Sequence, residues 1–198
     1  MAMGLRERKR RLIAHELAQT AYDLTVERGL SGFTIEELTD RAGYARRTFT
    51  NYYSCKEEAV AALAVEELNA GVVSLPDFPD DTPLIEWLRA LAKHQLSNGL
   101  MDVLVKLEAL SKQNPGLEPY LSRVYKEIRL TAWQIVHDRF PDDITPQQIN
   151  ILVGAAYGAL TMMLNQISQP SPESATTLDR EAAANFLDAV FDQLKTGF

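Results

Sequence analysis

The sequence is poor in the residues that cross-link proteins or bind metals. Cys55 is the single cysteine, so no disulfide can form within one chain. The three histidines, His15, His94 and His137, lie far apart, and they do not show the spacing of metal ligands. We therefore predict neither a disulfide framework nor a metal site.

Long apolar runs are also missing. No stretch approaches the roughly 20 apolar residues that a membrane-spanning helix requires, and the first residues are charged where a secretory signal would be apolar. A composition of 46% hydrophobic and 24% charged residues is typical of a folded globular protein. These features predict a cytoplasmic protein with no membrane partner.

Signatures of catalysis are absent as well. The 198 residues include no Gly-rich phosphate loop, no G-x-S-x-G motif and no acidic pair in a clear catalytic setting. We expect a protein that is not an enzyme and that carries no cofactor.

What the sequence does have is an uneven distribution of charge. Residues 1–53 hold nine Arg and Lys against seven Asp and Glu, a net charge of +2, whereas residues 54–198 hold eleven against twenty, a net charge of −9. The densest basic stretch is R-E-R-K-R-R at residues 6–11. A protein that meets a polyanion with one end and keeps the remainder acidic shows this pattern.

The basic end begins with two helix signals. Apolar residues recur at helical spacing over residues 6–28, and Gly29 stands where such a helix would end. Thr34 and Glu37 then have the form of a capping box, in which the threonine oxygen accepts the amide of residue 37 and the glutamate reaches back. We expect a second helix that runs from this box to about residue 41.

A third helix follows closely. Gly43 can adopt the left-handed conformation that ends a helix, and helix signals resume over about residues 45–52. Two helices joined by a turn of about three residues that contains glycine have the outline of a helix-turn-helix. Phe49 and Tyr53, four residues apart, can pack against the first two helices. The polar side chains of the third helix then remain for base edges or phosphates.

Further helices, punctuated by proline, make up the rest of the chain. We expect them at about residues 56–73, 83–97, 100–112, 116–139, 146–168 and 178–195. Thr82-Pro83, Asn114-Pro115 and Thr145-Pro146 each place a capping side chain before a proline at the first helical position. No segment shows the alternation of a strand. The predicted fold is all-α, with a three-helix helix-turn-helix domain at residues 1–55 fused to a larger helical bundle at residues 56–198.

The segment G-F-T-I-E-E-L-T-D-R-A-G-Y-A-R-R-T-F-T-N-Y-Y-S-C-K-E-E resembles the amino-terminal signature of the tetracycline-repressor (TetR) family of transcriptional regulators. The resemblance covers about residues 8–60. It implies an N-terminal domain that binds DNA and a C-terminal bundle that binds a ligand and dimerises. Two positions depart from the family pattern: Thr50 stands in place of an aromatic residue and Cys55 in place of serine. Because cysteine is a poorer cap, we expect Ser54 to cap the helix that follows.

The resemblance implies a set of DNA contacts. Thr34 would hold a phosphate with its hydroxyl and the amides of its helix, which is compatible with a plain capping role. Arg46 or Arg47 can donate two hydrogen bonds to a guanine, the alternative being a solvated helix face. The basic residues 6–11 would follow the minor groove, or form a frayed terminus. The implied set is Thr34, Tyr44, Ala45, Arg46, Arg47, Thr48, Thr50, Asn51, Tyr52 and Lys56.

Two helices carry candidate dimer contacts. Small residues recur at three- and four-residue spacing within residues 146–168, and the last helix has a broad apolar stripe. Under two-fold symmetry these helices would form a four-helix interface. Packing within the chain is the alternative for each residue of the set, which is Gly154, Ala155, Gly158, Ala159, Phe186, Leu187, Val190, Phe191 and Leu194.

Candidate ligand contacts are aromatic, methionine and leucine side chains with one histidine. Such residues line pockets for apolar small molecules, although packing in the core is the alternative for each. The set is Trp87, Leu91, His94, Met101, Leu104, Leu107, Trp133, Tyr157 and Met162.

Together these features predict a ligand-responsive transcriptional regulator, more often a repressor in this family. It would bind a palindromic operator in double-stranded DNA as a homodimer and be released by an apolar small-molecule effector. The alternative is a helical protein-interaction module whose basic patch meets an acidic partner.

Overall fold

The computed structural model describes residues 4–167 and 179–196, which form nine α-helices, one short 3-10 helix and no strand. Among these helices, none combines the length and the apolar content that crossing a bilayer demands. Because every regular element of the described residues is helical, the all-α prediction is confirmed. The helices are α1 Leu5–Arg28, α2 Ile35–Ala42, α3 Arg46–Thr50, α4 Lys56–Val73, α5 Leu84–Ser97, α6 Leu100–Gln113, η1 Pro115–Leu117, α7 Glu118–Arg139, α8 Pro146–Ile167 and α9 Arg180–Thr196.

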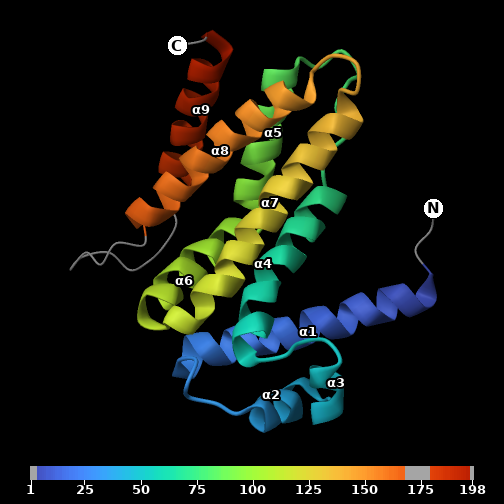
Figure 1. Cartoon of the computed structure of the whole chain (residues 1–198), viewed down its shortest axis with the longest axis vertical. Coiled ribbons are helices and arrows are strands. Elements are labelled where there is room, and N and C mark those ends of the chain that lie inside the picture. Colours follow the sequence, from blue (N-terminus) through green and yellow to red (C-terminus); the bar gives the residue numbers. More distant parts are fainter. Residues whose placement is uncertain (1–3, 168–178, 197–198) are drawn as a thin grey trace.

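The helices are arranged in a bundle with a short three-helix unit at one end. Figure 1 shows α1 lying across the lower end of the bundle, with α2 and α3 beneath it. Helix α4 rises from α1 and packs against both α1 and α7. Helix α9 packs against α5 and α8. The helix-turn-helix is thus joined to the bundle mainly through α4.

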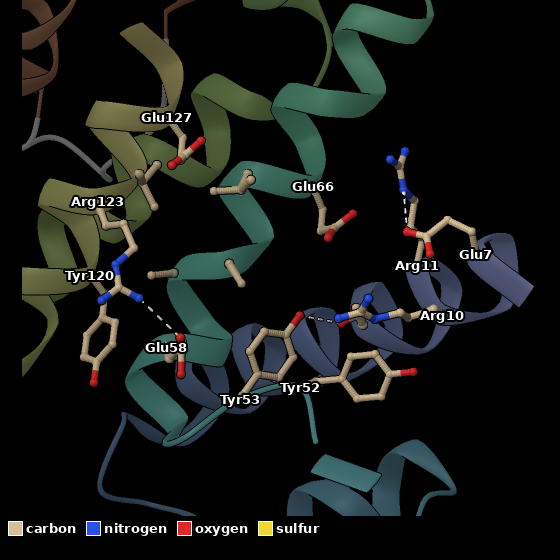
Figure 2. A pocket seen from close by; sticks show the side chains of 15 residues that line it. Glu7, Arg10, Arg11, Tyr52, Tyr53, Glu58, Glu66, Tyr120, Arg123 and Glu127 are labelled. Carbon is tan, nitrogen blue, oxygen red and sulfur yellow. Dashed lines mark hydrogen bonds and ion pairs between the residues drawn. The ribbon is translucent and has the colours of Figure 1, made fainter. Parts of the chain in front are cut away.

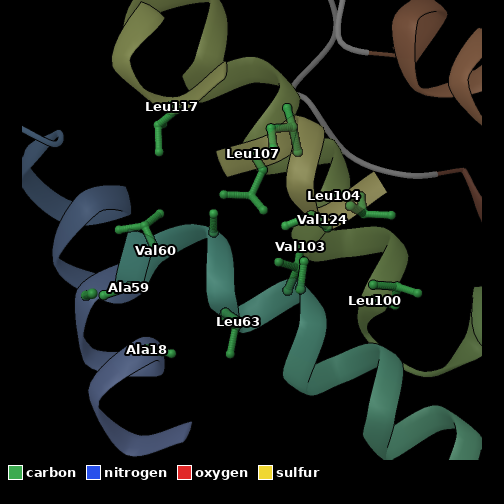
Figure 3. Packing of buried hydrophobic residues seen from close by; sticks show 14 of the residues in the cluster. Ala18, Ala59, Val60, Leu63, Leu100, Val103, Leu104, Leu107, Leu117 and Val124 are labelled. Atoms are coloured by element: carbon green, nitrogen blue, oxygen red, sulfur yellow. The ribbon is translucent and has the colours of Figure 1, made fainter. Parts of the chain in front are cut away.

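One hydrophobic core continues from the three-helix unit into the bundle. Leu17 of α1, Phe49 of α3, Leu63 of α4 and Leu104 of α6 belong to the same cluster, and each is less than 2% exposed. Figure 3 shows side chains of α1, α4, α6 and α7 meeting in this cluster. Each such side chain contributes about 1.5–3 kcal/mol through burial. A displacement of α4 would therefore disturb packing on both sides of it.

A second cluster lies at the other end of the bundle. The ring of Trp87 on α5 packs edge-on against Phe140, with 5.5 Å between centroids, and against Phe78 at 6.2 Å. Phe191 of α9 is 2% exposed and belongs to this cluster. This second core attaches α9 to α5 and α8.

The helix starts confirm one capping prediction and correct another. The Glu37 amide donates to Thr34 Oγ1 at 3.1 Å, and the Thr34 amide donates to Glu37 Oε2 at 2.7 Å, as the capping box requires. The expectation that Ser54 caps α4 was wrong. Cys55 is the N-cap, because its Sγ accepts from the Glu58 amide at 3.4 Å, while the Ser54 hydroxyl donates to the Glu58 carboxylate at 2.6 Å.

The three threonine- and asparagine-proline pairs differ in outcome. Thr145 Oγ1 accepts from the Gln148 amide at 3.3 Å and α8 begins at Pro146, as predicted. The other two predictions were wrong. Pro83 is itself the N-cap of α5 and Thr82 makes no capping bond. Asn114 does stand at the N-cap of η1 with Pro115 after it, as predicted, but its side chain makes no capping bond there. It donates instead to Leu110 O at 2.9 Å, at the end of α6.

Candidate nucleic-acid interface and internal cavity

The turn between α2 and α3 has the geometry expected of a helix-turn-helix. Gly43 ends α2 in the left-handed conformation, with φ 75° and ψ 27°. Phe49 is fully buried, and its ring lies 5.8 Å from that of Tyr53, whose hydroxyl donates to Ala14 O at 2.9 Å. The packing role predicted for Phe49 and Tyr53 is confirmed. These contacts attach α3 to α1, so that the remaining faces of α3 point to solvent.

Most of the residues proposed to contact DNA are accessible. Tyr44, Thr48, Tyr52 and Lys56 are half-buried. The exposed ones are Thr34, Ala45, Arg46, Arg47, Thr50 and Asn51. Their contacts with DNA remain predictions.

The two adjacent arginines of α3 differ in their surroundings. The Arg46 guanidinium donates to the Glu36 carboxylate in the first turn of α2. Arg47 is exposed, and its guanidinium has no hydrogen bond or ion pair within the described residues. Arg47 is therefore the cation of α3 that can bind an anion without first exchanging a partner.

Other basic side chains near the interface are already engaged. Arg41 donates to both carboxylate oxygens of Glu27 at 2.6 Å. Lys56 Nζ donates to the carbonyls of Leu30 and Phe33 at 2.7 and 2.5 Å, and it lies 4.5 Å from the centroid of the Phe33 ring. Lys56 therefore holds the loop before α2, and one ammonium proton remains for any phosphate.

The aromatic residues of the turn also have intrachain partners. The Tyr44 hydroxyl donates to the Glu16 carboxylate of α1, and this bond raises the pKa of Tyr44. Tyr52 and Tyr53 have ring centroids 6.4 Å apart. Sequence analysis did not predict the Tyr44 contact, since its partner lies on another helix.

The basic residues 6–11 lie in the first turns of α1 rather than in an extended arm. They are all exposed. Arg10 and Tyr52 line a cleft of about 370 Å³ between α1, α4 and α7, and Figure 2 shows both residues at its α1 side. On the opposite side Arg123 of α7 pairs with Glu58 of α4 at 3.4 Å. Acidic and basic side chains thus both line this cleft.

A separate cavity of about 150 Å³ lies among α5, α6, α7, α8 and α9. Three of the residues predicted to contact a ligand line it: Leu91, Met101 and Tyr157. Sequence analysis missed Gln95 and Arg129, which also line it. Neither belongs to an aromatic or methionine stripe, which was the pattern used to select candidates.

The other six predicted ligand residues do not line this cavity. Trp87, Leu104 and Leu107 are buried in the cores described above, and Met162 is 60% exposed. Trp133 stacks on His137, with 4.9 Å between ring centroids. His94 Nε2 lies 3.1 Å from Ser74 Oγ at the end of α4. Their helical spacing indicated inward faces but not which inward faces meet at a void.

One lining residue also touches α4. Gln95 Oε1 is buried and has no hydrogen-bond partner within the described residues. A Cβ atom placed on Gly71 of α4 would lie 2.3 Å from this oxygen. The glycine is therefore needed for the side chain of Gln95 to occupy its position.

Some of the candidate dimer residues lie on an open helix face, whereas others pack within the chain. A Cβ atom placed on Gly154 or Gly158 would meet no other atom within 4 Å, and the neighbouring Ile151 and Met162 are 62% and 60% exposed. Ala155, Ala159, Phe186, Leu187, Val190 and Leu194 are half-buried. Phe191 is a correction, because its side chain is buried within the chain and cannot be offered to a partner.

The comparison with protein-family models concerns the part of the chain that contains the helix-turn-helix. Residues 17–63 match the family model described as bacterial regulatory proteins, tetR family. A solved structure of a transcriptional regulator of the TetR/AcrR family from Thermobifida fusca YX-ER1 is similar at 16% identity, with 93% of this chain and 97% of that chain covered and a TM-score of 0.49. Among curated proteins, none matches the chain.

Proposed function

We propose that this chain is a DNA-binding transcriptional regulator of the kind described by the tetR family model that its residues 17–63 match, and that it represses transcription by binding a palindromic operator as a homodimer. An apolar small-molecule effector releases it. Residues 1–55 bind DNA, and residues 56–198 bind the effector and dimerise. Because its target is bacterial DNA, its place is the cytoplasm.

The observation that carries this proposal is the exposed guanidinium of Arg47 on a short helix anchored by Phe49 and Tyr53. A helix held in this way can enter the major groove, where arginine donates two hydrogen bonds to N7 and O6 of guanine. Thr34 is exposed at the N-terminus of α2, where its hydroxyl and the amides of the helix can hold a phosphate.

Dimerisation is supported by the open face of α8. Gly154 and Gly158 leave room for another helix to approach closely, and Ile151 and Met162 offer apolar side chains beside them. A two-fold dimer through α8 and α9 would present two copies of α3 to successive major grooves, about 34–36 Å apart.

Effector release is supported by the cavity among α5, α6, α7, α8 and α9. Its lining is mostly apolar, as in sites for small organic molecules. An effector that binds more tightly to a conformation in which the two copies of α3 no longer fit the grooves would shift the equilibrium away from DNA.

The test is selection of bound sites from random duplex DNA, followed by affinity measurements at several salt concentrations. We expect a palindromic site and an affinity that falls steeply as salt rises, because phosphate contacts release counterions. Absence of binding to any duplex at low salt would refute the proposal. Binding without sequence preference would favour the protein-interaction module instead.

A further inference from the structure

The cavity among α5 to α9 has one charged residue in its lining. Leucine, alanine, methionine, valine, isoleucine and phenylalanine side chains make up most of the wall. Gln95 and Tyr157 are polar, Arg129 of α7 is the cation, and no acidic residue lines the cavity. An apolar cavity with a single charged group favours a ligand that carries the opposite charge at one end.

Arg129 has no carboxylate partner of its own. Its side chain is exposed, and the guanidinium carbon lies 5.2 Å from the centroid of the Tyr157 ring. No hydrogen bond or ion pair joins it to the described residues. Glu108 accepts a hydrogen bond from Tyr125, whose ring packs edge-on against Tyr157.

Several other basic residues of the bundle are paired. Arg89 binds Asp192 at 2.5 Å and Lys93 binds Asp188 at 2.7 Å, both between α5 and α9. Arg139 binds Asp80 at 2.9 Å. In a chain with a net charge of −7, acids to pair with Arg129 are plentiful. Its unpaired state beside the cavity therefore distinguishes it from these neighbours.

We propose that the effector is an apolar carboxylic acid whose hydrocarbon part fills the cavity and whose carboxylate accepts hydrogen bonds from Arg129. This assignment rests on the proposed ligand response of the same cavity. Arginine binds carboxylates through two parallel hydrogen bonds of the charge-assisted kind, and tyrosine stacking holds the guanidinium plane in place. A volume of about 150 Å³ suits one aromatic ring or a chain of moderate length.

The experiment compares three probes of equal chain length by calorimetry on the DNA-free protein: octanoate, 1-octanol and octylammonium. We expect octanoate to bind roughly tenfold more tightly than 1-octanol, as one charge-assisted contact allows, and octylammonium to bind more weakly than both. Arg129→Gln should reduce the affinity for octanoate to that for 1-octanol and leave 1-octanol unchanged. Ala156→Leu, which adds bulk to the cavity wall, should weaken octanoate and 1-octanol alike.

The matched control is Lys126→Gln, which removes the same charge one turn earlier on α7 from an exposed residue outside the lining. It should retain the preference for octanoate. The proposal is overturned if no probe binds, if 1-octanol or octylammonium binds as tightly as octanoate, or if the preference survives in Arg129→Gln. Release of operator DNA is measured separately. If octanoate binds without lowering the affinity for DNA, effector release is contradicted, whereas the proposed acid-binding site is not.

Discussion

Arg46 of α3 donates a hydrogen bond to Glu36 of α2, so one of the two adjacent arginines of the helix-turn-helix already holds a carboxylate. Arg47 has no such partner within the described residues. Two residues that look equivalent in the sequence therefore start from different states when the protein meets DNA.

Arg47→Ala should lower affinity for the selected operator by about 1–3 kcal/mol, the discrimination that a bidentate arginine–guanine contact supplies. Arg46→Ala should lower it less, because Arg46 exchanges its bond to Glu36 for one to DNA. Fluorescence anisotropy with the operator and a scrambled duplex measures both. Parental affinity in both variants would show that neither arginine reads bases.

Glu36→Gln should increase affinity for duplex DNA of any sequence. The change removes a negative charge from the first turn of α2 and frees Arg46. Stability should change by less than about 1 kcal/mol, because both partners of the pair are exposed. Binding isotherms at two salt concentrations give the result, and Glu181→Gln, the same change on α9, is the control. Equal affinities in the two variants would place Glu36 away from the DNA.

Lys56→Met should reduce the free energy of unfolding by about 1–3 kcal/mol, because the carbonyls of Leu30 and Phe33 lose their donor. DNA affinity should fall as well, since these carbonyls belong to the loop before α2. Urea unfolding provides the measurement. Lys9→Met, an exposed cation in the first turns of α1, should leave stability unchanged. An unaltered unfolding midpoint in Lys56→Met would indicate that the ammonium serves phosphate alone.

Stability should decrease in acid partly through Glu37. Hydrogen bonds from the Thr34 amide and hydroxyl to the carboxylate, with Arg28 and Lys56 nearby, hold the pKa of Glu37 below its ordinary value. The stabilisation that Glu37 contributes is fully present above the ordinary glutamate pKa of about 4.3. It is lost as the pH falls through the lower pKa that Glu37 has in the folded protein. The difference in urea midpoint between the parent and Glu37→Gln should therefore shrink from pH 7 to pH 3. Equal midpoint differences at pH 7 and pH 3 would contradict this role of Glu37.

Gly158→Leu should weaken the dimer at least tenfold without harming the fold. A Cβ atom at this position would lie more than 4 Å from every described atom outside its own stretch of helix, and leucine favours a helix over glycine by about 1 kcal/mol. Sedimentation equilibrium and circular dichroism together separate the two effects. Ser122→Leu on α7 introduces the same side chain on another exposed surface and should leave the dimer intact. An unchanged dimer in Gly158→Leu would exclude this face of α8.

Local chemistry made much of the fold predictable. The capping box of Thr34 and Glu37 and the left-handed turn at Gly43 depend on residues three or fewer apart, and both occur as expected. The start of α4 at Lys56 was also predicted, but its cap was not. The choice between Ser54 and Cys55 depended on where the Glu58 carboxylate lies, and this is a property of the folded turn.

The site was less predictable because it depends on residues distant in sequence. The bond between Tyr44 and Glu16 joins positions 28 apart, and no pattern in the sequence indicates it. Helical spacing placed Trp87 and Leu91 on an inward face; both belong to the second core, but only Leu91 also lines the cavity. The importance of Arg129 lies in the lack of a partner, which only the packed helices reveal.

The close approach of Gln95 to Gly71 joins the cavity wall to the helix that carries the DNA-binding unit. A substitution of Gln95 that changes which molecules bind in the cavity would also change how α4 packs against α5. We therefore expect that a substitution which changes the effector preference of the cavity also changes how readily the protein releases DNA. Compensating substitutions along α4 should accompany such changes.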